Sequence, residues 1–267
     1  DDRDWVLDLR RNGCGLADQV HLSSEGEPSR SVTVAWHTAS GREPAQVRFR
    51  EAGSDTGWQR CPAASADSPG AGRIHTARLA GLSPDTEYLC EVSHDAPEPG
   101  GYSKPFPFRT APEDLAKPVR FAFLCDTGLT GRLDGNVDGA ASVLEHLLAD
   151  QPRFVLGGGD WAYANRDRRF RCVADAIDEW FCQWQPLLCQ VPFYTQFGNH
   201  EAVLEERYED WAPRLAQPEG SGDGRSFSFD VAGIHIAAPF VPNERGFAEE
   251  AARTDSPLLS WLDRDLA

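Results

Sequence analysis

Apolar and polar residues alternate one by one in the first part of the chain. This two-residue period is clearest in residues 31–37 and 46–50, and turn-rich segments separate the two stretches. Strict alternation places every second side chain on the same face of a strand, so each stretch predicts a strand with one buried face. A further alternating stretch carries Tyr88 near its start. Together these stretches predict an all-β sandwich over residues 18–111.

The pattern changes after Thr110. Residues 112–118 show no apolar period and contain two prolines, which favour an extended connector. Further along, short apolar runs alternate with stretches of helical spacing, and this alternation is typical of a mainly parallel sheet. We therefore expect an N-terminal extension at residues 1–17, a connector at 112–118 and an α/β domain over residues 119–267.

The elements of the second domain follow from the same reasoning. Residues 119–125 are an apolar run of strand length, which predicts a buried strand. The aromatic residues Trp180, Phe181 and Trp184 are expected in the core or in a contact between the domains. Further strands are predicted at residues 154–156 and 193–197, helices at 139–150, 175–188 and 257–267, and a hairpin at 226–239.

Composition and charge narrow the class of protein. The 267 residues carry a net charge of −16 and give a pI near 4.8, which argues against a surface for nucleic acid or anionic membranes. The longest apolar runs, such as residues 121–125, fall far short of the ~20 residues that span a bilayer. Seven cysteines without C-x-x-C spacing argue against zinc fingers and thioredoxin-like chemistry. A disulfide between Cys182 and Cys189 is left open by the sequence.

Chemically distinctive side chains follow three of the predicted strands. Each strand exit carries a glycine and at least one oxygen-bearing side chain. Because the carboxyl ends of parallel strands meet at one edge of a sheet, we expect these side chains to lie together. Carboxylate and amide oxygens bind hard cations, and a carboxylate between two ions can bridge them. The sequence therefore predicts a dinuclear metal centre at this edge. The residues concerned are Asp126, Asp160, Tyr163, Asn199, His200 and Glu201.

Several of these residues also have a purely structural interpretation. Asp126 could cap a helix in a turn, and Asn199 could simply form a turn. Tyr163 could be a packing residue. His235 lies in the middle of an apolar stretch, so we expect a hydrogen-bonded core histidine there and not a metal ligand.

The motifs at the strand exits resemble those of a known family. The metallophosphoesterases share blocks that read D-x-G, then G-D-x-x-Y, then G-N-H-E. The tyrosine in the second block indicates the purple acid phosphatases in particular. The matching segments here are Asp126-Thr127-Gly128, Gly159-Asp160-Trp161-Ala162-Tyr163 and Gly198-Asn199-His200-Glu201.

The first domain resembles a fibronectin type III domain. Leu82, Pro84, Thr86 and Tyr88 match its L-x-P-x-T-x-Y corner, and Trp36 matches its buried early tryptophan. The corner tyrosine is expected to hydrogen-bond back to the chain at the turn. The resemblance as a whole implies a fibronectin-like sandwich followed by a calcineurin-like metallophosphoesterase domain that is incomplete in this chain.

The resemblance to the purple acid phosphatases assigns a role to each metal ligand. Asp126 and Tyr163 would bind the first metal ion. Asp160 would bridge both ions, and Asn199 would bind the second. Phenolate ligation suits a trivalent cation, so the implied pair is Fe(III) with Zn(II), Mn(II) or Fe(II).

The same resemblance implies an enzyme, a metal-dependent phosphoric monoester hydrolase of the acid phosphatase type. A metal-bound hydroxide would attack the phosphate ester in line. His200 would hydrogen-bond the phosphoryl oxygen or the leaving group, and Glu201 would orient its neighbours. The alternatives are a phosphodiesterase of the same superfamily and a non-catalytic binding or adhesion module with a degenerate metal site.

The family's site also contains three further histidines, two of them in a G-H-x-H block. No such block occurs in this sequence. We expect the chain to be a fragment that stops before those motifs; a short protein with a weak metal site and a site completed by a partner chain are the alternatives. The resemblance favours a secreted protein, and the sequence leaves the compartment and the oligomeric state open.

Overall fold

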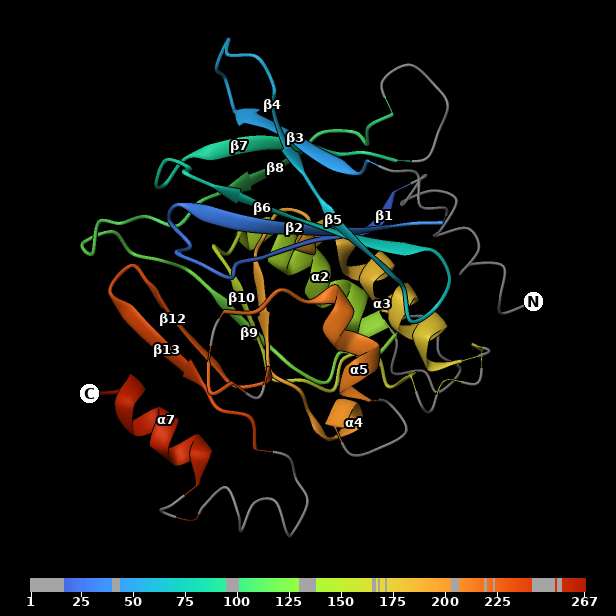
Figure 1. Cartoon of the computed structure of the whole chain (residues 1–267), viewed down its shortest axis with the longest axis vertical. Helices are drawn as coiled ribbons and strands as arrows, with labels where there is room; N and C mark the ends of the chain where they lie inside the picture. Colours follow the sequence, from blue (N-terminus) through green and yellow to red (C-terminus); the bar gives the residue numbers. More distant parts are fainter. Residues whose placement is uncertain are drawn as a thin grey trace.

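A β-sandwich and an α/β domain make up the described chain, the sandwich at the top of Figure 1 and the α/β domain below it. Within the described residues, no helix is both long enough and apolar enough to cross a membrane. The computed structural model describes residues 17–39, 44–94, 101–129, 138–164, 167, 169–170, 172–202, 207–218, 220–222, 224–241, 253 and 256–267. Most of the predicted N-terminal extension therefore lies outside the described residues.

The sandwich consists of two antiparallel sheets that enclose one apolar core. Buried side chains from both sheets, among them Trp36 and Val47, form this core. The prediction of a single buried face is wrong for residues 31–38, which are buried on both faces, because remote groups cover the polar face, as Asp18 and the Ala71 carbonyl do at His37. The first sheet has the order β1 (Asp18–Ser23), β2 (Ser31–Thr38), β6 (Arg73–Ala80) and β5 (Ala64–Asp67). The second sheet has the order β4 (Gln59–Pro62), β3 (Gln46–Glu51), β7 (Glu87–Val92) and β8 (Phe106–Arg109).

Tyr88 forms the predicted corner of the sandwich. Its hydroxyl oxygen accepts a hydrogen bond from the backbone N–H of Ser83 at 2.8 Å. Its ring stacks on Phe108 with the ring centroids 5.5 Å apart. Tyr88 therefore ties the turn to β7 and β8, and the prediction of a stabilising role is confirmed.

The α/β domain is built on a parallel sheet with the order β11 (Phe193–Thr195), β10 (Val155–Gly157) and β9 (Ala122–Leu124). Val155 and Phe193 pack on one face, against α2 (Asp138–Asp150) and α3 (Val173–Leu188). The predicted fold class is confirmed. The remaining elements are the hairpin of β12 (Phe227–Val231) and β13 (Ile234–Ala238), with α4 (Asn199–Ala202), α5 (Tyr208–Trp211), η3 (Ala212–Arg214) and α7 (Pro257–Asp265).

The opposite face of the parallel sheet packs against the hairpin. Phe154 and Tyr194 lie in one apolar cluster with Phe229 of β12, and the rings of Tyr194 and Phe229 stack 4.1 Å apart. Helices on one face and a hairpin on the other bury both sides of β10 and β11. This two-sided burial agrees with their short, almost wholly apolar sequences.

The strand β9 differs from its prediction. It is shorter than the predicted residues 119–125, and this segment is not buried: Phe121, just before β9, is 44% exposed, and Phe123 within it is 64% exposed. The reason is its position, because β9 is the outer strand of the described sheet and pairs only with β10 there. An apolar run predicts a strand, whereas its burial depends on neighbours that the run itself does not specify.

One other side chain lies where the sequence did not place it, and the disulfide that the sequence left open is not formed. His235 is hydrogen-bonded as predicted, but it is exposed and not in the core, because Asp230 and Asp265 hold its ring at the surface. Cys182 and Cys189 are both free thiols. They lie seven positions apart along α3 and its cap, a rise of about 10 Å, which is too far for a disulfide.

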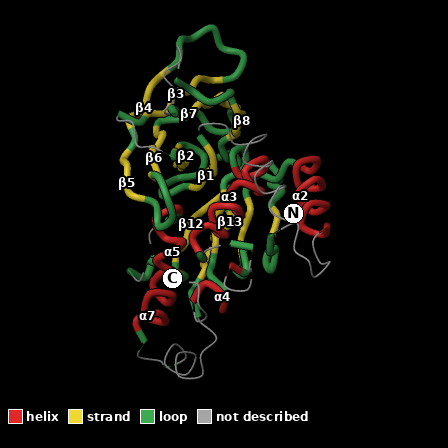
Figure 2. Tube along the Cα trace, turned by 90° about the vertical axis from the view of Figure 1, so that its right-hand side faces the viewer, coloured by secondary structure: helices red, strands yellow, loops and turns green. Residues whose placement is uncertain are grey.

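The helix α3 joins the two parts of the protein. It packs against β1 of the sandwich, where Gln185 Oε1 accepts the backbone N–H of Val20 at 2.9 Å and Phe181 lies 4.5 Å from the ring of His21. Figure 2 shows α3 beside β1 from the side. Trp180, Phe181 and Trp184 are buried in the core of the α/β domain, and Phe181 also contacts His21 of the sandwich, so the prediction of a place in the core or at the domain contact is confirmed. The predicted domain limits at residues 111 and 119 stay a prediction.

Candidate metal centre

The predicted site residues follow the carboxyl ends of the three parallel strands. Asp126 comes two residues after β9, Asp160 three residues after β10, and Asn199 four residues after β11. Parallel strands bring these exits to one edge of the sheet. The backbone confirms their proximity, since the N–H of Asp126 donates to the carbonyl of Gly159 at 3.1 Å.

Tyr163 and Asp126 meet across two strand exits. The phenolic hydroxyl of Tyr163 donates to Asp126 Oδ1 at 2.5 Å. Partial burial, and then the hydrogen bond to Asp126, raises the pKa of the Tyr163 hydroxyl above its usual range. Asp126 itself is exposed, and Tyr163 is half-buried. Two oxygen atoms that could bind a metal ion, from different loops, therefore lie together at a position that solvent reaches.

Asp160 is held from the loop that follows β11. The backbone N–H of His200 donates to Asp160 Oδ1 at 2.9 Å. Gly198 makes this approach possible, because a Cβ at that position would lie 2.1 Å from the same oxygen. Gly159 is equally constrained, since its Cβ would lie 2.0 Å from the backbone nitrogen of Gly198. The glycines in the motifs are thus needed for the close contact of the two loops.

Glu201 links the loop that follows β10 to the loop that follows β11. Its carboxylate accepts backbone hydrogen bonds from Asp160 at 2.8 Å, Trp161 at 2.7 Å and Gly198 at 2.9 Å. Burial raises the pKa of this carboxyl, and the three N–H donors act in the opposite direction. These contacts agree with the predicted role of Glu201 in orienting its neighbours.

The backbone at the site is strained. Asp126, Asp160 and Tyr163 have φ angles of 55°, 56° and 50°, in the left-handed region. Only seven non-glycine residues in the described part of the chain have such angles, and three of them are predicted metal ligands. For a bulky residue such as Tyr163 this conformation is a real outlier. Strain of this kind costs ~1–3 kcal/mol per residue and clusters at functional sites.

His200 and Asn199 complete the predicted set from the start of α4. The ring of His200 is buried and lies 4.2 Å from that of Tyr163, centroid to centroid. Asn199 is half-buried and stands between Gly198 and His200, the two residues that approach Asp160. The structure thus brings Asp126, Asp160, Tyr163 and His200 into direct contact, and it places Asn199 in the same loop.

Sequence reasoning missed a set of hydroxyl and indole groups that support the loops. Thr127 Oγ1 accepts from Trp180 Nε1 at 2.9 Å and donates to the carbonyl of Trp161 at 3.0 Å. The indole of Trp161 donates to Thr195 Oγ1 at 2.8 Å. These contacts fix the loops after β9 and β10 to α3 and β11. No local signal singles out Thr127, Thr195 or the two indoles, because threonine and tryptophan also occur at many positions without such a role.

The donor set is chemically suited to hard cations. Its members are two carboxylates, a phenol and an amide, all of which bind through oxygen. Among the described residues, no group of three His, Cys, Asp or Glu side chains stands at metal-binding distance. The convergence of Tyr163 and Asp126, with Asp160 held nearby, nevertheless fits a cation site of oxygen ligands. The residues present therefore fit the metal centre that the motifs imply.

Comparison with known proteins agrees with the sequence motifs. Residues 17–110 match the family model of the purple acid phosphatase N-terminal domain. Purple acid phosphatase 23 of Arabidopsis thaliana is 27% identical over 88% of this chain and 57% of its own length. A phosphoenolpyruvate phosphatase of Allium cepa is 25% identical over 91% of this chain and 52% of its own length. The chain spans about half the length of these relatives.

A solved structure supports the same fold. The purple acid phosphatase from yellow lupin seeds superimposes with a TM-score of 0.62 and 20% sequence identity. The match covers 82% of this chain and 43% of the lupin chain, so it extends through both the sandwich and the α/β domain. The predicted resemblance to the purple acid phosphatases is confirmed in sequence and in fold.

Proposed function

We propose that this purple acid phosphatase-like chain carries part of the active site of a metal-dependent phosphatase that hydrolyses phosphomonoesters. The relatives support the reaction class, since they are named as purple acid phosphatases and, in one case, as a phosphoenolpyruvate phosphatase. The observation that carries the proposal is the 2.5 Å contact between Tyr163 and Asp126 at the shared edge of the sheet. The ring of Tyr163 also contacts His200, but packing alone does not explain left-handed backbone and a hydroxyl directed at a carboxylate.

The proposed metal centre is dinuclear. Asp126 and Tyr163 would hold the first ion, Asp160 would lie between the two, and Asn199 would hold the second. A phenolate favours a trivalent ion, so Fe(III) paired with Zn(II), Mn(II) or Fe(II) fits this donor set. When bound, such ions supply positive charge for the phosphoryl group and lower the pKa of water.

The chain's own residues position these ligands. Glu201 holds the backbone of Asp160 and Gly198 together, so the Asp160 carboxylate has a fixed place before any ion binds. The His200 N–H fixes one oxygen of that carboxylate. The imidazole of His200, beside Tyr163, would donate a hydrogen bond to a phosphoryl oxygen or protonate the leaving group. Positioning of this kind accounts for much of the catalysis of phosphoryl transfer.

Metal analysis combined with p-nitrophenyl phosphate turnover tests the proposal. The full-length protein that contains this chain, supplied with Fe(III) and a divalent ion, should bind metal and release p-nitrophenol, and Asp160→Asn in that protein should lose both properties. Asp55→Asn is the matched control, because Asp55 is an exposed carboxylate in the sandwich, outside the site. Equal metal content and turnover in the parent and in Asp160→Asn would overturn the proposal.

Two other outcomes identify the alternatives. Faster turnover of bis(p-nitrophenyl) phosphate than of the monoester would indicate a phosphodiesterase instead. Stable folding without metal binding or turnover would support a binding module with a degenerate site. His200→Asn separates catalysis from metal binding, since it should lower kcat while the metal content stays at the parent level.

A further inference from the structure

A cleft of about 640 Å³ lies between the sandwich and the α/β domain, away from the candidate metal centre. Its residues come from β7 and β8 on one side, and from the segments around α2, α3 and the strand starts on the other. Arg120 precedes β9, Arg153 precedes β10 and Val191 precedes β11. The cleft therefore opens at the amino edge of the parallel sheet, whereas the predicted metal ligands stand at its carboxyl edge.

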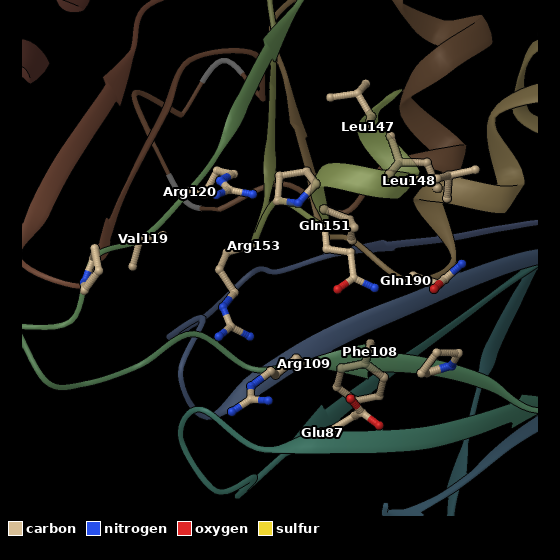
Figure 3. Close-up of a pocket in the computed structure, with 15 residues that line it drawn as sticks. Glu87, Phe108, Arg109, Val119, Arg120, Leu147, Leu148, Gln151, Arg153 and Gln190 are labelled. Carbon is tan, nitrogen blue, oxygen red and sulfur yellow. The ribbon is translucent and has the colours of Figure 1, made fainter. Parts of the chain in front are cut away.

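The two walls of the cleft face each other in Figure 3. Phe108 and Arg109 of β8, with Glu87 of β7, form the lower wall. Arg153 and Gln151 reach down from the upper wall, and Arg153 points towards Arg109. A volume of this size is in the range of pockets that hold small organic molecules, ~300–1,000 Å³.

The charged side chains that line this cleft are Arg109, Arg120, Arg153 and Glu87, so cations predominate in it although the protein has a net charge of −16. Asp85 and Lys117 lie outside the lining but are bonded to it. Arg109, Arg153 and Lys117 all donate to the carboxylate of Asp85, at 2.9, 2.9 and 2.7 Å. One carboxylate thus pairs with three cations. Their positive charge lowers the pKa of Asp85 to about 2, and the hydrogen bond from Lys117 has the largest effect. Glu87, opposite Arg109 in the β7–β8 register, adds a second negative charge. Arg120 also lines the cleft, but its Nη1 donates to the carbonyl of Asp150 and lies 3.9 Å from the carboxylate of that residue.

Arg153 is the least exposed of these cations. Its side chain is about one quarter exposed, at 28%, and its Nη2 donates to Asp85. Burial, and then the facing charge of Arg109, lowers the pKa of Arg153. Asp85 Oδ1 accepts from both guanidinium groups, so two cations share one anionic oxygen, and a second anion beside them would offset the remaining positive charge. Guanidinium groups are also well suited to hold a carboxylate or phosphate through two parallel hydrogen bonds.

The rest of the lining is apolar or uncharged. Phe108, Leu187 and Val191 are buried, and Leu147 and Leu148 of α2 are half-buried. Gln151 and Gln190 add amide groups that can donate or accept. An apolar surface next to a cationic end is complementary to a molecule with an apolar body and one anionic head. An inorganic ion would make no contact with the apolar side chains of the cleft.

We propose that this cleft is a binding site for a small organic anion, with its carboxylate or phosphate head on Arg153 and Arg109 and its apolar body against Phe108, Leu147 and Leu148. Because the two walls belong to different domains, the bound anion also stabilises the contact between them. The site is separate from the proposed metal centre and does not depend on the phosphatase reaction.

Naphthoate is a suitable probe, since it joins one carboxylate to an apolar ring system and is not a phosphate ester. We expect calorimetry to detect binding, and the unfolding temperature to rise with naphthoate concentration. The uncharged naphthamide and inorganic phosphate alone should each bind at least about tenfold more weakly, because each lacks one half of the ligand. Equal binding of naphthamide, or of inorganic phosphate, would overturn the proposal.

Variants locate the anionic head. Arg153→Gln should weaken naphthoate binding about tenfold or more. Gln151→Glu is a second variant that preserves the Asp85 ion pairs and places a negative charge in the cleft, and it should weaken binding in the same direction. Arg60→Gln removes an exposed arginine of β4 and is the matched control, with unchanged binding. Parent-like affinity in both Arg153→Gln and Gln151→Glu would contradict the assignment.

Discussion

The hydroxyl of Tyr163 lies 2.5 Å from a carboxylate oxygen of Asp126, although the two residues are 37 positions apart in the chain. Neither residue belongs to a helix or a strand, and each has left-handed backbone. The contact exists because β9 and β10 are parallel and end at the same edge. This hydrogen bond directly links the D-x-G motif, which contains Asp126, to the G-D-x-x-Y motif, which contains Tyr163.

Tyr163→Phe tests the role of this contact. Only one partly exposed hydrogen bond is lost, so the free energy of unfolding should fall by no more than about 1 kcal/mol. If Tyr163 binds Fe(III) as a phenolate, the visible absorbance of the iron-loaded protein should disappear in the variant. An unchanged spectrum and unchanged iron content would show that Tyr163 is not a ligand.

Glu201→Gln should destabilise the protein by about 2–3 kcal/mol. The carboxylate accepts three backbone N–H groups, whereas the amide has one oxygen and turns an NH₂ group towards a donor. Urea unfolding in the absence of metal measures this effect. Glu209→Gln, at an exposed position in α5, should change the stability by less than about 0.5 kcal/mol. A similar small change in Glu201→Gln would contradict the bridging role of Glu201.

Gly159→Ala and Gly53→Ala form a matched pair. Both glycines have positive φ, 89° and 74°, so both variants pay a conformational cost of about 1–2 kcal/mol. A Cβ at Gly53 meets nothing within 4 Å, whereas one at Gly159 lies 2.0 Å from the backbone of Gly198. We expect Gly159→Ala to lose at least about 1–3 kcal/mol more than Gly53→Ala in urea unfolding. Equal losses would mean that the two loops do not pack this closely.

The buried ion pair between Asp178 and Arg214 should be essential to stability. The two side chains are 2.5 Å apart, and Arg214 is only 1% exposed. Asp178→Asn leaves the guanidinium without its counter-charge, which should cost about 3–5 kcal/mol. Asp263→Asn, at an exposed position of α7, serves as the control. If thermal unfolding of the two variants is alike, the pair is weaker than its burial indicates.

His235 should titrate above its usual range. Its ring nitrogens lie 2.9 Å from Asp230 and 3.0 Å from Asp265, and these two hydrogen bonds raise its pKa. The folded state therefore binds the proton more tightly than the unfolded state. The resulting stabilisation is complete below the unfolded pKa of about 6.5 and is lost as the pH rises through the folded pKa. NMR titration of the imidazole should show the raised value, and Asp265→Asn should lower it; a pKa unchanged by Asp265→Asn would contradict the contact with α7.

The local patterns were sufficient for most elements of the fold. Alternation in residues 31–37 and 46–50 predicted β2 and β3, and helical spacing predicted α2 almost to the residue. These predictions succeeded because side-chain period is a property of the strand or helix itself. The strand exits were found for a similar reason, since Gly159 and Gly198 of the motifs are required by close contacts that the structure shows.

Predictions that depended on remote neighbours were less successful. The apolar run around Phe123 was expected to be buried, but it lies in the outer strand of the described sheet. His235 was expected in the core, but the pleat of β13 and the approach of Asp265 keep it at the surface. In each case the strand forms as predicted, but the elements that would have to pack over the side chain to bury it do not do so.

The sequence by itself therefore determined the strands, the helices and the identity of the candidate metal ligands, because these depend on residue types within short segments. Only the tertiary structure decided that Tyr163 meets Asp126, that Glu201 holds two loops, and that Arg153 faces Arg109 across a cleft between the domains. The physical reason is that such contacts join segments far apart in the chain. Their formation depends on the packing of whole sheets and helices, which no local pattern specifies.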